Sequence, residues 1–122
     1  MIRKLGLWII FYVANARIWM IMFNWDWDKA KKNWSKHKVS FDEAKTVFND
    51  PLYIDFYDPD HSETEERYLI VGRSIQENLL IVSYTEREDL IRIISARKVT
   101  KLERRVYEQE WWINERRFTP RI

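Results

Sequence analysis

Four apolar segments with short connections between them constrain the fold of this chain more than any other feature. The last two are separated only by Arg87, Glu88 and Asp89. Consecutive strands joined this closely pair antiparallel, because a parallel pair needs a long crossover connection. The sequence therefore predicts an antiparallel meander of four strands, at residues 52–57 (LYIDFY), 67–74 (RYLIVGRS), 78–86 (NLLIVSYTE) and 90–97 (LIRIISAR).

Two helices are predicted before the meander. Asp26 or Asp28 can cap the first, and one face of it carries Trp27, Ala30, Trp34 and His37. The second begins with the capping box Ser40–Glu43, and residues 49–51 (Asn-Asp-Pro) stop it.

A third helix is predicted after the meander. Thr100 and Glu103 form its capping box, and its apolar stripe is Leu102, Val106 and Ile113. Two helices packed on one face of a meander, followed by one more helix, give an α+β domain whose other sheet face stays partly open.

Residues 1–22 differ from the rest of the chain. Arg3 and Lys4 precede the apolar run of residues 5–13, and Ala14–Ala16 resembles a cleavage site. The first interpretation is that the start codon is assigned too far upstream and that the protein begins at Met20 or Met22. A secretory signal peptide is the second interpretation. A membrane anchor is less favoured, because the apolar run is too short to span a membrane. We expect residues 1–19 to pack little against the body, as an isolated helix or a loose strand.

The charge distribution excludes a bulk polycation. Three of the 21 basic residues precede Met22 and all 19 acidic residues follow it, so residues 23–122 are close to neutral. Any affinity for nucleic acid must come from a local patch, and residues 92–105 supply one with Glu103 as their single acidic residue. With no cysteine, the chain has neither disulfides nor thiolate metal sites, which fits a reducing cytoplasm.

The side chains available for chemistry are arginine, histidine, carboxylate and tyrosine. They suit RNA cleavage without metal: a base deprotonates the 2′-hydroxyl, arginines hold the phosphate charge, and an acid protonates the leaving 5′-oxygen. Arg67 and Arg73 share strand parity and project from one sheet face. Arg97 and Lys98 lie where the last strand meets the last helix, whose amides add to a phosphate site.

Each of these residues also has a structural interpretation. Arg92 can form an ion pair with Glu86 or Glu66, and His61 can be an ordinary loop histidine. Asp58 and Asp60 can bind a metal ion together with His61, although the spacing is weak evidence. His37, on the aromatic face of the first helix, has the position of a packed, hydrogen-bonded histidine.

Three stretches carry a resemblance to a known family: FNWDWDKAKKNWSKHKVSFDEAKTVFNDP, DPDHSETEERYLIVG and VSYTEREDLIRIISARKVTKLERRVYE. Together they resemble BrnT, the ribonuclease toxins of bacterial type II toxin–antitoxin modules, over about residues 23–108. The chain departs from the family pattern at Trp27, where proline is usual, and at Lys38, where glycine is usual. The domain is thus expected at residues 23–110, with extensions at 1–22 and 111–122.

The resemblance implies a fold similar to that of RelE toxins and a cytoplasmic endoribonuclease that arrests growth. We also expect no cofactor and no metal, because the candidate groups are arginines, a histidine and carboxylates. A BrnA-like antitoxin is the expected partner, RNA the substrate, and operator DNA is reached only through the antitoxin. The implied catalytic residues are His61 as acid or base and Arg67, Arg92 and Arg97 on the phosphate, with Tyr84 and Glu86 as secondary candidates. RNA binding is expected from Arg73, Lys98, Lys101, Arg104 and Arg105.

Two other functions remain open on sequence alone. The chain can be a non-catalytic partner that stabilises a DNA-binding antitoxin, because phosphate contacts provide affinity without specifying chemistry. It can also be a secreted protein, and the evidence for that hypothesis comes only from residues 1–19.

Overall fold

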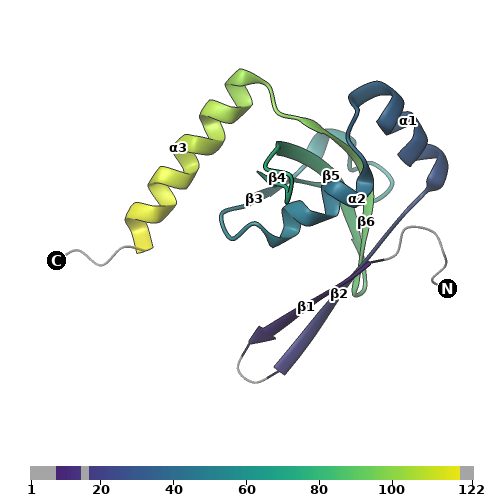
Figure 1. Cartoon of the computed structure of the whole chain (residues 1–122), viewed down its shortest axis with the longest axis horizontal. Helices are drawn as coiled ribbons and strands as arrows, with labels where there is room; N and C mark the ends of the chain where they lie inside the picture. Colours follow the sequence, from purple (N-terminus) through teal and green to yellow (C-terminus); the bar gives the residue numbers. More distant parts are fainter. Residues whose placement is uncertain (1–7, 15–16, 119–122) are drawn as a thin grey trace.

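The computed structural model describes the backbone of residues 8–14 and 17–118 and the side chains of residues 22–109. Its strands are β1 (Trp8–Ala14), β2 (Arg17–Trp25), β3 (Ile54–Tyr57), β4 (Tyr68–Arg73), β5 (Leu79–Arg87) and β6 (Leu90–Lys98). Its helices are α1 (Trp27–His37), α2 (Phe41–Ala44) and α3 (Lys101–Phe118), with 3-10 turns η1 (Lys45–Asn49) and η2 (Pro59–His61). Figure 1 shows α1 and α2 on one side of the sheet and α3 leaning away on the other.

The predicted α+β meander is present. β3, β4, β5 and β6 pair antiparallel in chain order, each within a few residues of its expected bounds. The turn between β5 and β6 places Glu88 at a positive φ of 56°, as a tight hairpin requires.

The prediction of a four-stranded, wholly antiparallel sheet is wrong in its extent. The sheet has six strands in the order β1-β2-β6-β5-β4-β3, and β2 pairs parallel with β6. Only Met22–Trp25 of β2 make that pairing, while the full length of β1 pairs with β2. Parallel addition of β2 to β6 is favourable because it places Phe23 and Trp25 in the core, where they are 0% and 4% exposed.

The prediction that residues 1–19 form an isolated helix or a loose strand is also wrong for the part the structure describes. Trp8–Ala14 and Arg17–Trp25 form an antiparallel hairpin that continues the sheet (Figure 1). An unbroken apolar run shows neither the alternation of a half-exposed strand nor a helical period, so the pattern gave no indication of a hairpin.

The two helices before the meander form as predicted, although the second is short. Asp26 caps α1 by accepting hydrogen bonds from the backbone amides of Asp28 and Lys29. Ser40 caps α2 through the amide of Glu43. The Glu43 carboxylate does not return to Ser40; it accepts from Ser74 Oγ at 2.6 Å and Asn78 Nδ2 at 2.8 Å, tying α2 to the turn after β4.

Side chains pack on both faces of the sheet. The larger cluster lies between the sheet and α2–η1 and contains Phe23, Phe41, Leu80 and Ile93. A smaller cluster, with Val71, Ile81 and Tyr107, lies on the opposite face beneath the start of α3. The Tyr107 hydroxyl donates to Asp50 at 3.2 Å, and burial raises the pKa of Tyr107 to about 12.

Asn33 closes the part of the β6 edge that β2 leaves unpaired. Its side-chain amide donates to the Ala96 carbonyl at 2.8 Å, and its oxygen accepts from the Ala96 amide at 3.0 Å. The same Nδ2 also donates to the carbonyl of Val39. One buried side chain therefore replaces a neighbouring strand and fixes α1 against the sheet.

A β-bulge changes the side-chain parity of β6. Ser83 pairs with Ser95 but Tyr84 pairs with Ile93, so Ile94 is the extra residue. Ser95 and Arg97 lie on the face beneath α3. Because Ile94 is the extra residue, Arg92, on the other side of the bulge, lies on that face as well. Without the extra residue, Ile93 would take that side and Arg92 would turn towards the core.

The predicted capping box of α3 is present, since Thr100 Oγ1 accepts from the Glu103 amide and Glu103 accepts from the Thr100 amide. Its expected apolar stripe is not buried: Leu102 is 66% and Val106 51% exposed, and the side chain of Ile113 lies outside the described residues. Among the described helices, none has the length and apolar character needed to cross a membrane.

Candidate active site

A cavity of about 1060 Å3 lies between the open sheet face and the first turns of α3. Apolar side chains such as Phe56, Leu69 and Val106 line one part of it. Its polar lining contains three of the four predicted catalytic residues, His61, Arg67 and Arg97, together with Asp58. Arg97 and Glu103 close the cavity at the junction of β6 and α3.

The strand register explains why distant residues meet at this face. Asp58 donates its amide to the Arg67 carbonyl at 2.9 Å, and Tyr68 pairs with Tyr84, which places Arg67 beside Thr85. Thr85 in turn pairs with Arg92, and Arg92 with Asn24 of β2. One row of the sheet thus carries Asp58, Arg67, Thr85, Arg92 and Asn24 on the face away from the main core.

His61 is held by a carboxylate. Its Nδ1 lies 2.9 Å from Asp58 Oδ2; the imidazole side chain is 67% exposed and the Asp58 side chain only 11%. If Nδ1 donates to the Asp58 carboxylate, the lone pair is on Nε2, and Nε2 can accept a proton. The Asp58–His61 pair is therefore arranged for proton transfer at Nε2.

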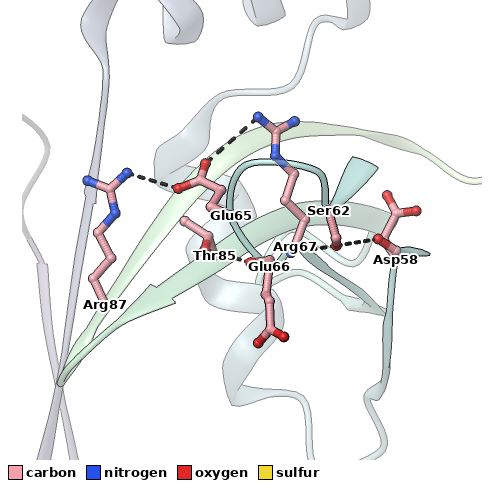
Figure 2. Close-up of polar contacts among 7 residues, drawn as sticks. All are labelled: Asp58, Ser62, Glu65, Glu66, Arg67, Thr85 and Arg87. Atoms are coloured by element: carbon pink, nitrogen blue, oxygen red, sulfur yellow. Dashed lines mark hydrogen bonds and ion pairs between the residues drawn. The ribbon is translucent and has the colours of Figure 1, made fainter. Parts of the chain in front are cut away.

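Arg67 is positioned by the loop before it. Its amide donates to Ser62 Oγ, and that hydroxyl donates to the Asp58 carbonyl at 2.5 Å, so the loop that carries His61 also sets the start of β4 (Figure 2). Within the described residues the buried Nε of Arg67 has no hydrogen-bond partner. An incoming anion can supply the missing acceptor.

Glu65 lies between two arginines. Its carboxylate accepts from Arg87 Nη2 at 3.0 Å and lies 3.8 Å from Arg67 Nη2 (Figure 2). The hydrogen bond from Arg87 holds the pKa of Glu65 below its usual value. Two guanidinium groups around one oxyanion form an arrangement that can also receive a phosphate.

The other two predicted arginines differ in their contacts. Arg97 donates from Nη1 and Nη2 to the two oxygens of Glu103, at 2.7 and 2.8 Å. Arg92 is half-buried, and no hydrogen bond or ion pair of its side chain occurs among the described residues. The pKa of Asp26 is lowered mainly by the hydrogen bond from the Lys29 amide, and the charge of Arg92 contributes to that lowering. The alternative of an Arg92 ion pair with Glu86 or Glu66 is therefore wrong, and the bidentate ion pair belongs to Arg97.

Arg92 does not line the cavity, and neither do the remaining predicted residues. Arg73 is at the far end of β4, where it donates to the Glu77 carbonyl. Lys98, Lys101, Arg104 and Arg105 are exposed, but none of them lines the cavity. Tyr84 is 2% exposed in the main core, where burial raises its pKa and its hydroxyl donates to Asp55.

Several contacts of this site were not evident from the sequence. The pattern placed Asp58 only as a possible metal ligand, and across the described residues no three acidic or histidine side chains are grouped to hold a metal ion. His37 and Lys36, at the end of α1, reach the cavity lining, although no hydrogen bond of His37 occurs within the described chain. The three-residue spacing of Asp58 and His61 was the available signal for their pairing.

Comparison with known proteins decides the family. The model of the family described as "Ribonuclease toxin, BrnT, of type II toxin-antitoxin system" matches residues 25–103, which include all four predicted catalytic residues and the cavity lining except Val106 and Tyr107. The chain belongs to the BrnT family. It is thus a ribonuclease toxin of a type II toxin–antitoxin system, and such a system includes an antitoxin partner.

The other comparisons add little to this BrnT assignment. No curated protein matches the chain. The 1.1 Å crystal structure of the Brucella abortus ribonuclease toxin BrnT is similar to it, with a TM-score of 0.47 and 18% identity, covering 63% of this chain and 94% of that chain.

Proposed function

We propose that this BrnT-family chain is an endoribonuclease that cleaves RNA without metal, using His61 for proton transfer and Arg67 and Arg92 for phosphate stabilisation. The observation that supports it best is the shared location of the Asp58–His61 pair and Arg67, whose buried Nε lacks an acceptor. These are the groups that a metal-independent cleavage needs.

The reaction follows from those groups. The 2′-oxygen attacks the adjacent phosphorus as its proton leaves, and the bond from phosphorus to the 5′-oxygen breaks as that oxygen gains a proton. The products are a 2′,3′-cyclic phosphate and a 5′-hydroxyl. His61 Nε2 takes or returns a proton, Asp58 stabilises the imidazolium that forms, and the guanidinium groups hold the extra negative charge on the phosphorane.

Arg97 has a different role in this proposal from the one the family resemblance implied. Both of its terminal nitrogens are committed to Glu103. This end-on ion pair already balances the guanidinium charge, which weakens its attraction for a phosphate. We therefore assign Arg97 to holding α3 at the edge of the cavity and leave the phosphate to Arg67 and Arg92.

The proposed partners follow from the family. We propose that a BrnA-like antitoxin neutralises the enzyme in the cytoplasm and that the chain reaches operator DNA only through that antitoxin. The exposed basic residues outside the cavity, from Arg73 and Lys98 to Arg105, are available for the RNA backbone, where each contributes affinity rather than chemistry.

The test compares His61→Ala, Arg67→Ala and Arg92→Ala with the control Arg73→Ala, which lies on the same sheet face but at the far end of β4. Loss of an arginine at the phosphate should lower the cleavage rate by about 10²-fold or more. Loss of His61 should lower it by about 10²- to 10⁴-fold. Arg73→Ala should change the rate much less. The measurements are cleavage of total RNA in excess chelator, relief of growth arrest, and circular dichroism.

Three results would contradict the proposal. Full activity in the three site variants would show that these residues do not form the active site. Cleavage that chelator abolishes and a divalent ion restores would favour a metal-dependent reaction. A wild-type chain that binds antitoxin and tightens repression but never cleaves RNA would support the non-catalytic alternative.

A further inference from the structure

Two tryptophans on α1 are unusually exposed. Trp27 and Trp34 are each 52% exposed, although the sequence placed them on the face that also carries Ala30 and His37. The residue that α1 buries is Asn33. Trp27, Lys31, Trp34 and Lys38 are spaced so that they form one strip, two to three turns long, which we call the α1 aromatic surface.

The α1 aromatic surface borders a hollow. A depression of about 460 Å3 lies between it and the start of α2, lined by Trp25, Phe41 and Ser40 as well as by the two exposed tryptophans. Trp25 is 4% exposed, and its indole Nε1 is buried without an acceptor among the described residues. The hollow is therefore lined by the aromatic rings of Trp25, Trp27, Trp34 and Phe41.

The charge around this surface is strongly basic. Residues 27–38 carry five lysines and a single carboxylate, Asp28. Lys38 adopts a positive φ of 56°, which is costly for a residue other than glycine, and its ammonium lies 5.8 Å from the centre of the Trp34 ring. A surface of aromatic rings flanked by ammonium groups suits single-stranded nucleic acid, which presents π-faces and phosphates together.

The surface is also continuous with the active site. Lys36 and His37 line the cavity that contains His61 and Arg67. By helical periodicity the exposed residues Lys29, Lys32 and Lys36 occupy the outer face of α1, between that cavity and the two tryptophans. A strand that leaves the cavity can cross α1 over these lysines and reach the aromatic surface.

We propose that the α1 aromatic surface is a second RNA site, in which Trp27 and Trp34 stack on unpaired bases of the substrate beyond the cleaved bond. This rests on the proposed ribonuclease function and extends it to substrates with a single-stranded flank. A protein partner fits less well, because lysine is depleted at the centres of protein interfaces and here surrounds the tryptophans.

The experiment uses the full chain and a fluorescein-labelled oligoribonucleotide whose 2′-oxygens are methylated, so that it binds without being cleaved. The variants are Trp27→Ala, Trp34→Ala and the double variant, with Trp34→Phe as the conservative change. The matched control is Ile75→Ala, an apolar side chain that is 77% exposed in the turn after β4. Circular dichroism confirms folding, which substitution of half-exposed side chains should preserve.

Each alanine substitution should weaken binding by about 10-fold or more, as removal of a base-stacking aromatic does. For a cleavable RNA, KM should rise similarly while kcat changes little, because the surface does not touch the reacting phosphate. Trp34→Phe should retain most of the affinity and Ile75→Ala all of it. An abasic oligomer of the same length should bind the wild type weakly and should not distinguish the alanine variants from it.

The outcomes separate this proposal from the one on which it rests. Wild-type cleavage with unchanged affinity and KM in the double variant would overturn the second site and leave the ribonuclease proposal intact. Loss of antitoxin binding with unchanged RNA affinity would overturn it too, by assigning the surface to a protein. A wild type that neither binds nor cleaves RNA would overturn both.

Discussion

The ion pair between Arg97 and Glu103 shows how one contact can decide the role of an arginine. It is bidentate and joins the end of β6 to the first turn of α3. The hydrogen bonds from Arg97, together with those from Thr100, lower the pKa of Glu103 to about 2. Since about a third of each side chain is exposed, solvent screens the interaction and its contribution to stability is modest.

The pair predicts a pH dependence of folding. The pKa of Glu103 falls from 4.5 to about 2 on folding, so its contribution is fully present above pH 4.5 and is lost as the pH falls towards 2. Glu103→Gln should therefore be less stable than wild type at neutral pH, and the difference should shrink across that window. Denaturant unfolding of both proteins measures it. A difference independent of pH would contradict the assignment.

The same pair gives a test of the role of Arg97. If Arg97 only holds α3, Arg97→Ala and Glu103→Gln should lower stability and activity to similar, small extents. Direct phosphate binding would instead make Arg97→Ala inactive, while Glu103→Gln would keep its activity. The cleavage rates of the two variants, each compared at matched folded fraction, separate these cases.

At the residue scale the sequence, through its resemblance to the BrnT family, indicated three of the groups that line the cavity, His61, Arg67 and Arg97. It did not show that Asp58 holds His61 or that Glu65 lies between Arg67 and Arg87. Those contacts depend on how the loop of residues 58–66 folds, which no periodicity determines. Their functional roles remain predictions.

Among the elements, α1 is fixed by the bidentate contact of Asn33 with Ala96. Asn33→Ala would leave the buried amide and carbonyl of Ala96 and the carbonyl of Val39 without partners. We expect the free energy of unfolding to fall by about 2–4 kcal/mol, since each unsatisfied buried group costs about 1–3 kcal/mol and relaxation recovers part. Urea denaturation measures this, with the neighbouring exposed Lys32→Ala as control. Equal stability of the two variants would show that water satisfies the edge.

The elements of the body were predictable because their signals are local. Capping residues, turn residues and the period of two fixed the four meander strands and the starts of α1, α2 and α3. The β1–β2 hairpin and the parallel β2–β6 pairing were not predictable, because they join residues far apart in sequence and the apolar run had no period. The exposure of Leu102 and Val106 was not predictable either. A helical apolar stripe predicts burial, but in this structure few side chains pack on that stripe.

For the molecule as a whole, the hairpin is attached at one place. β1 pairs with β2, and β2 joins the body through Met22–Trp25. A chain that begins at Met22 keeps this pairing and both buried aromatic residues, so it should unfold cooperatively with a small loss of stability and cleave RNA at a rate close to that of the full chain. Urea denaturation and RNA cleavage test this. A truncated chain without a cooperative transition would show that the hairpin is part of the folding unit.

The bulge at Ile94 has a consequence for how this site can change over generations. Because side chains along a strand alternate, a point substitution can remove the guanidinium at position 92 but cannot move it to the other side of the sheet. Only the gain or loss of one residue between Ile93 and Ser95 does that, and it would exchange the sides of every residue before it in β6. The side of the sheet on which Arg92 lies thus depends on the number of residues in the bulge. Inserting or deleting a single codon there would move the side chains of residues 90–93 to the opposite face in one step.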